Sequence, residues 1–75
     1  MSIEVKTKVP GNIWKVLVKE GDQVKKGDTL FIMEVMKTEV NHHSPIDAKV
    51  INVNVANDQD GVDPGTVAII LEELT

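Results

Sequence analysis

The sequence predicts an all-β domain made of two similar halves, and three observations lead to this prediction. Strand-forming residues occur in short runs separated by Gly, Asp, Asn and Pro. No segment shows the apolar periodicity of a helix. The first half of the chain also resembles the second. Because 75 residues suffice for only one small core, we expect residues 1–75 to form a single domain.

Apolar runs bounded by turn residues give the expected strands in chain order. Residues 3–9 alternate between apolar and polar, which is typical of a strand with one buried face. In residues 50–55 the same alternation places Ile51, Val53 and Val55 on one face. Residues 30–35 are apolar at both parities, so we expect both faces of that strand to be covered. The expected strands are 3–9, 13–18, 30–35, 38–42, 50–55 and 67–71.

The two halves match over most of their length. Residues 11–18 align with 48–55, so that Ile13 falls on Val50. After a one-residue insertion near Asp58 the match resumes, with Asp22 on Asp60 and other pairs such as Gly27 on Gly65 and Ile32 on Ile70. Neither half can bury its apolar face alone. We therefore expect a flattened β-barrel, or barrel-sandwich hybrid, with pseudo-twofold symmetry.

The junction between the halves is the segment 35–38, which links two expected strands. In a symmetric fold this junction is a tight hairpin far from both termini, with Lys37 at its tip. Two-residue hairpins favour Asn-Gly or Asp-Gly, because type I′ turns require positive φ at both positions. Met36 and Lys37 break that rule. Such local mismatches are typical of functional sites.

Composition excludes several classes of function. The net charge is −4 and no basic stripe is present, so a nucleic-acid partner is not expected. The longest apolar run is too short to span a membrane, and the first residues do not form a signal peptide. The chain has no Cys, which suits the cytoplasm. We expect a monomer, since closed barrels leave few free edges.

Metal and aromatic sites are also not expected. His42 and His43 are adjacent, so on a strand they point to opposite faces, and we interpret them as a polar strand end. Asp58, Asp60 and Asp63 lack the later ligands of a calcium loop. Trp14 is expected to be a partly buried strand residue. The sequence shows neither a nucleophile–base pair nor a set of metal ligands, so a small enzyme is not expected.

The segment EVMKTE at residues 34–39 resembles the attachment motif of biotinyl domains, in which Met-Lys is followed by a second Met or a similar residue. Residues 11–16 and 20–28 resemble the first half of that family, and residues 44–50 resemble its second half. Thr38 stands where many members carry the second Met. The closest resemblance is to small free-standing biotin/lipoyl attachment proteins, and it covers nearly the whole chain.

The resemblance implies that a biotin protein ligase attaches biotin covalently to Lys37. The cofactor would then carry a carboxyl group from a biotin carboxylase to a carboxyltransferase, or serve a decarboxylase, while the domain itself performs no catalysis. Met36 is expected to be recognised by these partners. Two roles are open for Glu34, which either assists recognition by the ligase or is a structural or solvated residue. Val35 and Thr38 are interpreted mainly as strand ends that shape the turn. The alternatives are a lipoyl carrier of a 2-oxo acid dehydrogenase, which typically has Asp before the lysine and Ala after it, and an unmodified structural module.

Overall fold

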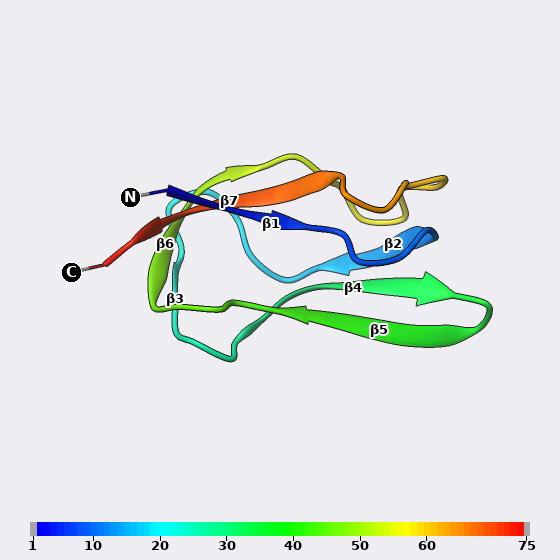
Figure 1. Ribbon diagram of the computed structural model, residues 1–75, viewed down its shortest axis with the longest axis horizontal. Coiled ribbons are helices and arrows are strands. Elements are labelled where there is room, and N and C mark those ends of the chain that lie inside the picture. Colours follow the sequence, from blue (N-terminus) through cyan, green and yellow to red (C-terminus); the bar gives the residue numbers. More distant parts are fainter. Residues whose placement is uncertain (1, 75) are drawn as a thin grey trace.

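The computed structural model describes residues 2–74, which form seven strands and no helix (Figure 1). The strands make two antiparallel sheets, one with the order β1-β7-β6-β3 and the other with the order β2-β4-β5. This arrangement confirms the predicted all-β barrel-sandwich fold. The strands are β1 (Ser2–Lys6), β2 (Asn12–Val16), β3 (Gln23–Val24), β4 (Thr29–Val35), β5 (Thr38–His43), β6 (Ala48–Val53) and β7 (Val67–Glu73).

One core lies between the two sheets and takes apolar side chains from both. Phe31 and Met33 enter it from the three-stranded sheet, and Ile69 and Leu71 enter it from the four-stranded sheet. Each of these four side chains is fully buried. Because neither sheet covers its own apolar face, each sheet buries that face only against the other. The complete buried apolar set is Ile13, Val24, Leu30, Phe31, Met33, Ala48, Val50, Val55, Val62, Ala68, Ile69 and Leu71.

Backbone hydrogen bonds confirm the predicted pseudo-twofold symmetry. The N–H of Leu17 donates to the carbonyl of Leu30 at 2.9 Å, and the N–H of Asn54 donates to the carbonyl of Ala68 at 2.8 Å. These two bonds occupy equivalent places in the two halves. The burial of β4 and β7 also follows the same order, residue by residue, over the first six positions.

The position of the inserted residue differs slightly from the sequence alignment. The N–H of Val50 donates to the carbonyl of Asp22, and at the equivalent place the N–H of Ile13 donates to the carbonyl of Gln59. Gln59, rather than Asp60, is therefore the structural counterpart of Asp22. The extra residue lies after Gln59 because the turn is set by its hydrogen bonds and not by the identity of one acidic residue.

β-bulges overturn two predictions about which side chains are buried. The register of β6 against β7 shifts between Val50 and Asn52, so Ile51 turns outward and is 40% exposed instead of sharing a face with Val53 and Val55. The equivalent shift in β2 leaves Trp14 42% exposed, more than the partly buried residue expected. Alternation cannot reveal an unpaired residue, and both errors have this cause.

A third register shift explains the apolar run of β4. Between Thr29 and Phe31 the pairing with β5 skips a residue, so Leu30 and Phe31 are both buried. Ile32 faces the other side and is only half-buried. The expectation that both faces of this strand are covered was therefore wrong, because the bulge rather than a second covering layer accounts for the apolar residues at both parities.

Strand ends also differ from the sequence prediction. β1 ends at Lys6 because the next residue, Thr7, bonds instead to the turn that contains Asp63 and Thr66. β2 begins one residue earlier than predicted and ends at Val16, and β6 spans Ala48–Val53 instead of 50–55. β3 has only two residues, too few to give a sequence pattern.

His42 is a core residue, which contradicts its interpretation as part of a polar strand end. Its side chain is 1% exposed and stacks on Phe31 with ring centroids 4.3 Å apart. The Nε2 atom accepts a hydrogen bond from the N–H of Lys8 at 3.3 Å. His43 is exposed, so the two rings do point to opposite faces, as predicted. The stacking on Phe31 and the hydrogen bond from Lys8 together allow the imidazole of His42 to be buried in the core.

The molecule is elongated, with extents of 38 × 18 × 17 Å. Figure 1 shows the β4–β5 turn at one end and the first and last described strands running to the other. Among residues 2–74, no helix has the length and apolar composition needed to cross a membrane.

Candidate functional site

The turn between β4 and β5 has the geometry that the sequence predicted. Val35 and Thr38 are opposite partners, so only Met36 and Lys37 form the loop. Their φ angles are 50° and 65°. Positive φ at both central residues is the requirement of a type I′ hairpin. Lys37 therefore lies at the tip of a two-residue reversal of the chain.

The strands below the turn impose this conformation. Left-handed backbone costs an ordinary L-residue about 1–2 kcal/mol, and two successive residues adopt it here. Met33, opposite Val40 on β5, is fully buried, so a slip of the hairpin by one residue would expose a core side chain. The register therefore leaves two residues to close the turn, whatever their own preference.

The side chains at the turn are open to solvent. Met36 is 94% exposed, which is unusual for a large apolar residue. Glu34, Lys37 and Thr38 are also exposed, while Val35 is half-buried. The structure thus brings the five predicted site residues together on one hairpin, with an apolar side chain next to a primary amine.

Gly11 is a residue of this region that the sequence analysis did not single out. A Cβ atom added there would lie 2.8 Å from the carbonyl oxygen of Glu34 and 2.8 Å from Cγ2 of Val35. Gly11 also exchanges two backbone hydrogen bonds with Val62. It therefore lets the segment before β2 pack directly on the end of β4. The Pro10-Gly11 pair ahead of a strand was the available signal.

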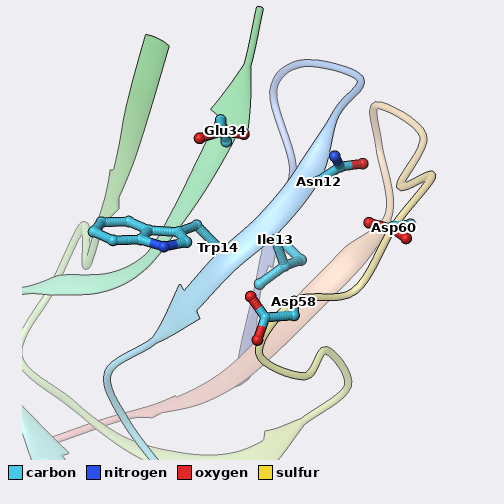
Figure 2. A pocket seen from close by; sticks show the side chains of 6 residues that line it. All are labelled: Asn12, Ile13, Trp14, Glu34, Asp58 and Asp60. Atoms are coloured by element: carbon cyan, nitrogen blue, oxygen red, sulfur yellow. The ribbon is translucent and has the colours of Figure 1, made fainter. Parts of the chain in front are cut away.

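A pocket lies on β2 beside the end of β4 (Figure 2). Figure 2 shows Trp14 and Glu34 on one side of β2, and Asn12 and Asp60 toward the other. The pocket walls combine an aromatic ring with several carboxylates. The lining residues are Asn12, Ile13, Trp14, Glu34, Asp58 and Asp60.

The chemistry available at the turn is that of an exposed amine. Within residues 2–74 no group of three or more His, Cys, Asp or Glu side chains is placed to hold a metal ion. The one ion pair among these residues joins Lys6 to Glu4, so no carboxylate within 4.0 Å holds the amine of Lys37. An accessible primary amine on a protruding turn can form an amide with an acyl group.

Comparisons with known proteins agree with this geometry. The family model described as "Biotin-requiring enzyme" matches residues 2–71. The chain is 43% identical over 63 residues to the mitochondrial methylcrotonoyl-CoA carboxylase subunit alpha of Dictyostelium discoideum, covering 84% of this chain and 9% of that protein. It is 50% identical over 36 residues to the biotin/lipoyl attachment protein of Bacillus subtilis, covering 48% of this chain and 49% of that one.

A solved structure supports the same assignment. The urea carboxylase of Kluyveromyces lactis matches 96% of this chain and 6% of its own, with a TM-score of 0.86 and 28% identity. A symmetric all-β fold with an exposed lysine on its central turn defines a carrier domain. The chain belongs to the biotin-requiring enzyme family. The matched segments cover less than half the length of each of these relatives.

Proposed function

We propose that Lys37 is the residue to which a biotin protein ligase attaches biotin, and that residues 1–75 act as one carrier unit. The observation that carries this proposal is the position of Lys37 on an exposed two-residue turn between the halves of the fold. When bound, the biotin group accepts and donates a carboxyl group. The domain contributes exposure and placement of the group rather than catalysis.

Each residue of the turn has a distinct proposed role. The amine of Lys37 forms an amide with biotin, and its positive charge is lost. Met36 is almost fully exposed and offers the apolar contact by which a ligase or carboxylase distinguishes this lysine from others. Glu34 provides a carboxylate that can accept hydrogen bonds from a partner protein close to Lys37. Val35 and Thr38 close the turn as opposite partners and so orient Lys37, in addition to any weaker contact.

The proposed partners are the enzymes between which the group moves. They are a biotin protein ligase, a biotin carboxylase and a carboxyltransferase, or a decarboxylase in place of the last two. A carboxylase role is supported by the relatives with that activity in their names. In this proposal the partner carboxyltransferase chooses the final substrate.

The test is to express the chain with a biotin ligase and, separately, with a lipoyl ligase, and to record the intact mass. We expect a biotin increment on Lys37, its loss in Lys37→Arg and its retention in the matched variant Lys49→Arg, which changes another exposed lysine. A lipoyl increment would instead assign the domain to 2-oxo acid dehydrogenases. No adduct with either ligase would leave an unmodified interaction module.

A further inference from the structure

The pocket on β2 lies within reach of a group attached to Lys37. Glu34, on the pocket wall, immediately precedes Val35, which closes the turn, and Asn12 is the partner of Glu34 on β2. With a rise of about 3.3 Å per residue and about 4.8 Å between strands, the pocket begins roughly 10 Å from the Lys37 backbone. A lysyl-biotin arm of roughly ten bonds spans on the order of 12 Å.

The walls of the pocket match the chemistry of the biotin ring. That ring has an apolar sulfur-containing half and a ureido half with two N–H donors and one carbonyl acceptor. Trp14 provides an exposed aromatic surface beside Ile13, and Glu34, Asp58 and Asp60 provide acceptors for N–H groups. Figure 2 shows these side chains around β2.

Asn12 provides the complementary donor. Its Oδ1 atom accepts a hydrogen bond from the N–H of Gly61 at 3.1 Å, which leaves the two Nδ2 hydrogens outside that bond. A second hydrogen bond joins the same loop to β2, since the N–H of Val16 donates to Oδ1 of Asn57 at 2.7 Å. The loop that carries Asp58 and Asp60 is thereby held against β2, so the pocket does not have to form on binding.

The charge of the pocket favours an uncharged ring with donor groups. No lysine lies within 4.0 Å of Glu34, Asp58 or Asp60 among the described residues. The Nζ atom of Lys15 lies 5.6 Å from the centre of the Trp14 ring, at the aromatic side of the pocket. An anionic group would be repelled here, whereas N–H donors are attracted.

The second half of the fold lacks this chemistry at the equivalent place. Asn12 pairs with Glu34 on β4, and at the same position Lys49 pairs with Glu72 on β7. The counterpart of Trp14 is Ile51, which is also the bulged residue of its strand. The aromatic ring and the amide are therefore confined to the end of the molecule that holds Lys37.

We propose that the uncarboxylated biotin ring attached to Lys37 folds back and rests in this pocket until a partner enzyme captures it. The inference rests on the proposed function, because it requires biotin on Lys37. Tethering gives the ring an effective concentration on the order of millimolar, so a site with a dissociation constant of about 1 mM is occupied roughly half of the time. A weak resting site of this kind leaves the arm free to be captured by an enzyme.

Trp14 reports on the pocket directly, because it is the only tryptophan of the chain. The full chain is prepared with and without biotin, and the intact mass verifies complete modification. We expect the emission of Trp14 to shift to shorter wavelength in the biotinylated protein and its acrylamide quenching constant to fall by roughly a third to a half. Fully biotinylated protein with unchanged emission and quenching would overturn the proposal, whereas absence of the mass increment would instead refute the proposed function.

Two comparisons separate ring binding from other causes. Lys37→Gln removes the charge without adding a ring, and it should leave Trp14 as in the unmodified protein; the same shift in this variant would overturn the proposal. In biotinylated protein carrying Asp58→Asn and Asp60→Asn the protection of Trp14 should weaken. The matched pair Glu20→Gln and Glu73→Gln, exposed carboxylates outside the pocket, should retain it. Equal protection in both pairs would contradict binding in this pocket.

Discussion

Glu34 on β4 and Glu39 on β5 lie directly opposite each other, one residue pair below the turn that holds Lys37. Both side chains are exposed. Like charges at directly opposite positions destabilise an antiparallel pair. The equivalent position in the other half joins Ser2 to Glu72, where only one residue is charged. On its other side Glu72 lies opposite Lys49 of β6, a pair of opposite charge. The hairpin that presents Lys37 thus keeps an unfavourable pair that the other half of the fold does not have.

Glu39→Lys should therefore stabilise the protein. The change converts the like-charged pair into an opposite-charged one, and we expect the free energy of unfolding to rise by about 0.2–0.5 kcal/mol, since exposed pairs are weak. Urea denaturation at low salt measures this change. Lys49→Glu is the inverse control and should destabilise by a similar amount. A Glu39→Lys protein no more stable than the parent would show that the carboxylates do not repel each other.

Replacing the turn by Asn-Gly should separate stability from modification. Met36→Asn with Lys37→Gly relieves the left-handed strain of both residues, and we expect a gain of about 1–2 kcal/mol in the free energy of unfolding. The same variant should take up no biotin in the mass assay. Met36→Asn alone keeps the lysine and should gain a smaller part of the stability. A double variant that is less stable than the parent would mean that the turn residues are not strained.

Gly11→Ala tests the close packing of the β2 entrance on β4. The new Cβ would meet backbone and side-chain atoms at 2.8 Å, closer than van der Waals contact, so something must move. We expect a loss of about 1–3 kcal/mol in the free energy of unfolding, measured by denaturant. The structural counterpart Ala48 is buried with its Cβ in place, and Ala48→Gly should cost only about 0.5–1 kcal/mol. Wild-type stability of Gly11→Ala would show that the contact is absent.

His42 should make the protein less stable in mildly acidic solution. Burial lowers the pKa of His42 below its usual value; the Val40 backbone partly opposes this, and the charges of Lys8 and His43 add to the lowering. Below about pH 6.5 the unfolded chain binds a proton that the folded protein resists. Stability therefore falls as pH decreases from about 6.5 towards the lowered pKa, and is fully present above that range.

The reason lies in the contacts of the ring. Nε2 accepts from the N–H of Lys8 and must give up this bond when it is protonated, while Nδ1 is buried without a hydrogen-bond partner. Urea midpoints between pH 7 and pH 5 measure the effect, and His42→Val should flatten the profile relative to the parent. Val5 occupies the corresponding place in the other half, opposite Ile69, so the substitution suits the fold. An equally steep profile in His42→Val would assign the dependence to other groups.

The fold and the turn were predictable because both follow from long-range consistency in the sequence. The match of Ile13 with Val50 and of Gly27 with Gly65 is a repeat, and a repeat of strands that cannot bury themselves requires a symmetric pair. The position of Lys37 followed from the same symmetry. That the two turn residues adopt positive φ was expected from the length of the loop, in spite of their identity.

The details that failed depend on neighbours that the sequence does not show. Alternation placed Ile51 on one face with Val53 and Val55, but a bulge in β6 turns it outward. The equivalent bulge in β2 exposes Trp14. The burial of His42 requires the stacked ring of Phe31 and a donor from a loop 34 residues away. Gly11 was passed over because its constraint is a distance to Glu34 and Val35 rather than a turn.

The placement of the turn at the end of the long axis opposite the first and last strands has a practical consequence (Figure 1). If a flexible tether were joined beside β1 or β7, the turn with Lys37 would point away from the tether. The turn could then reach enzymes in any direction around the point where the tether is attached. Lengthening such a tether would widen the range of enzymes visited without altering the contacts that they make. Reach and recognition can thus be tuned separately in one chain.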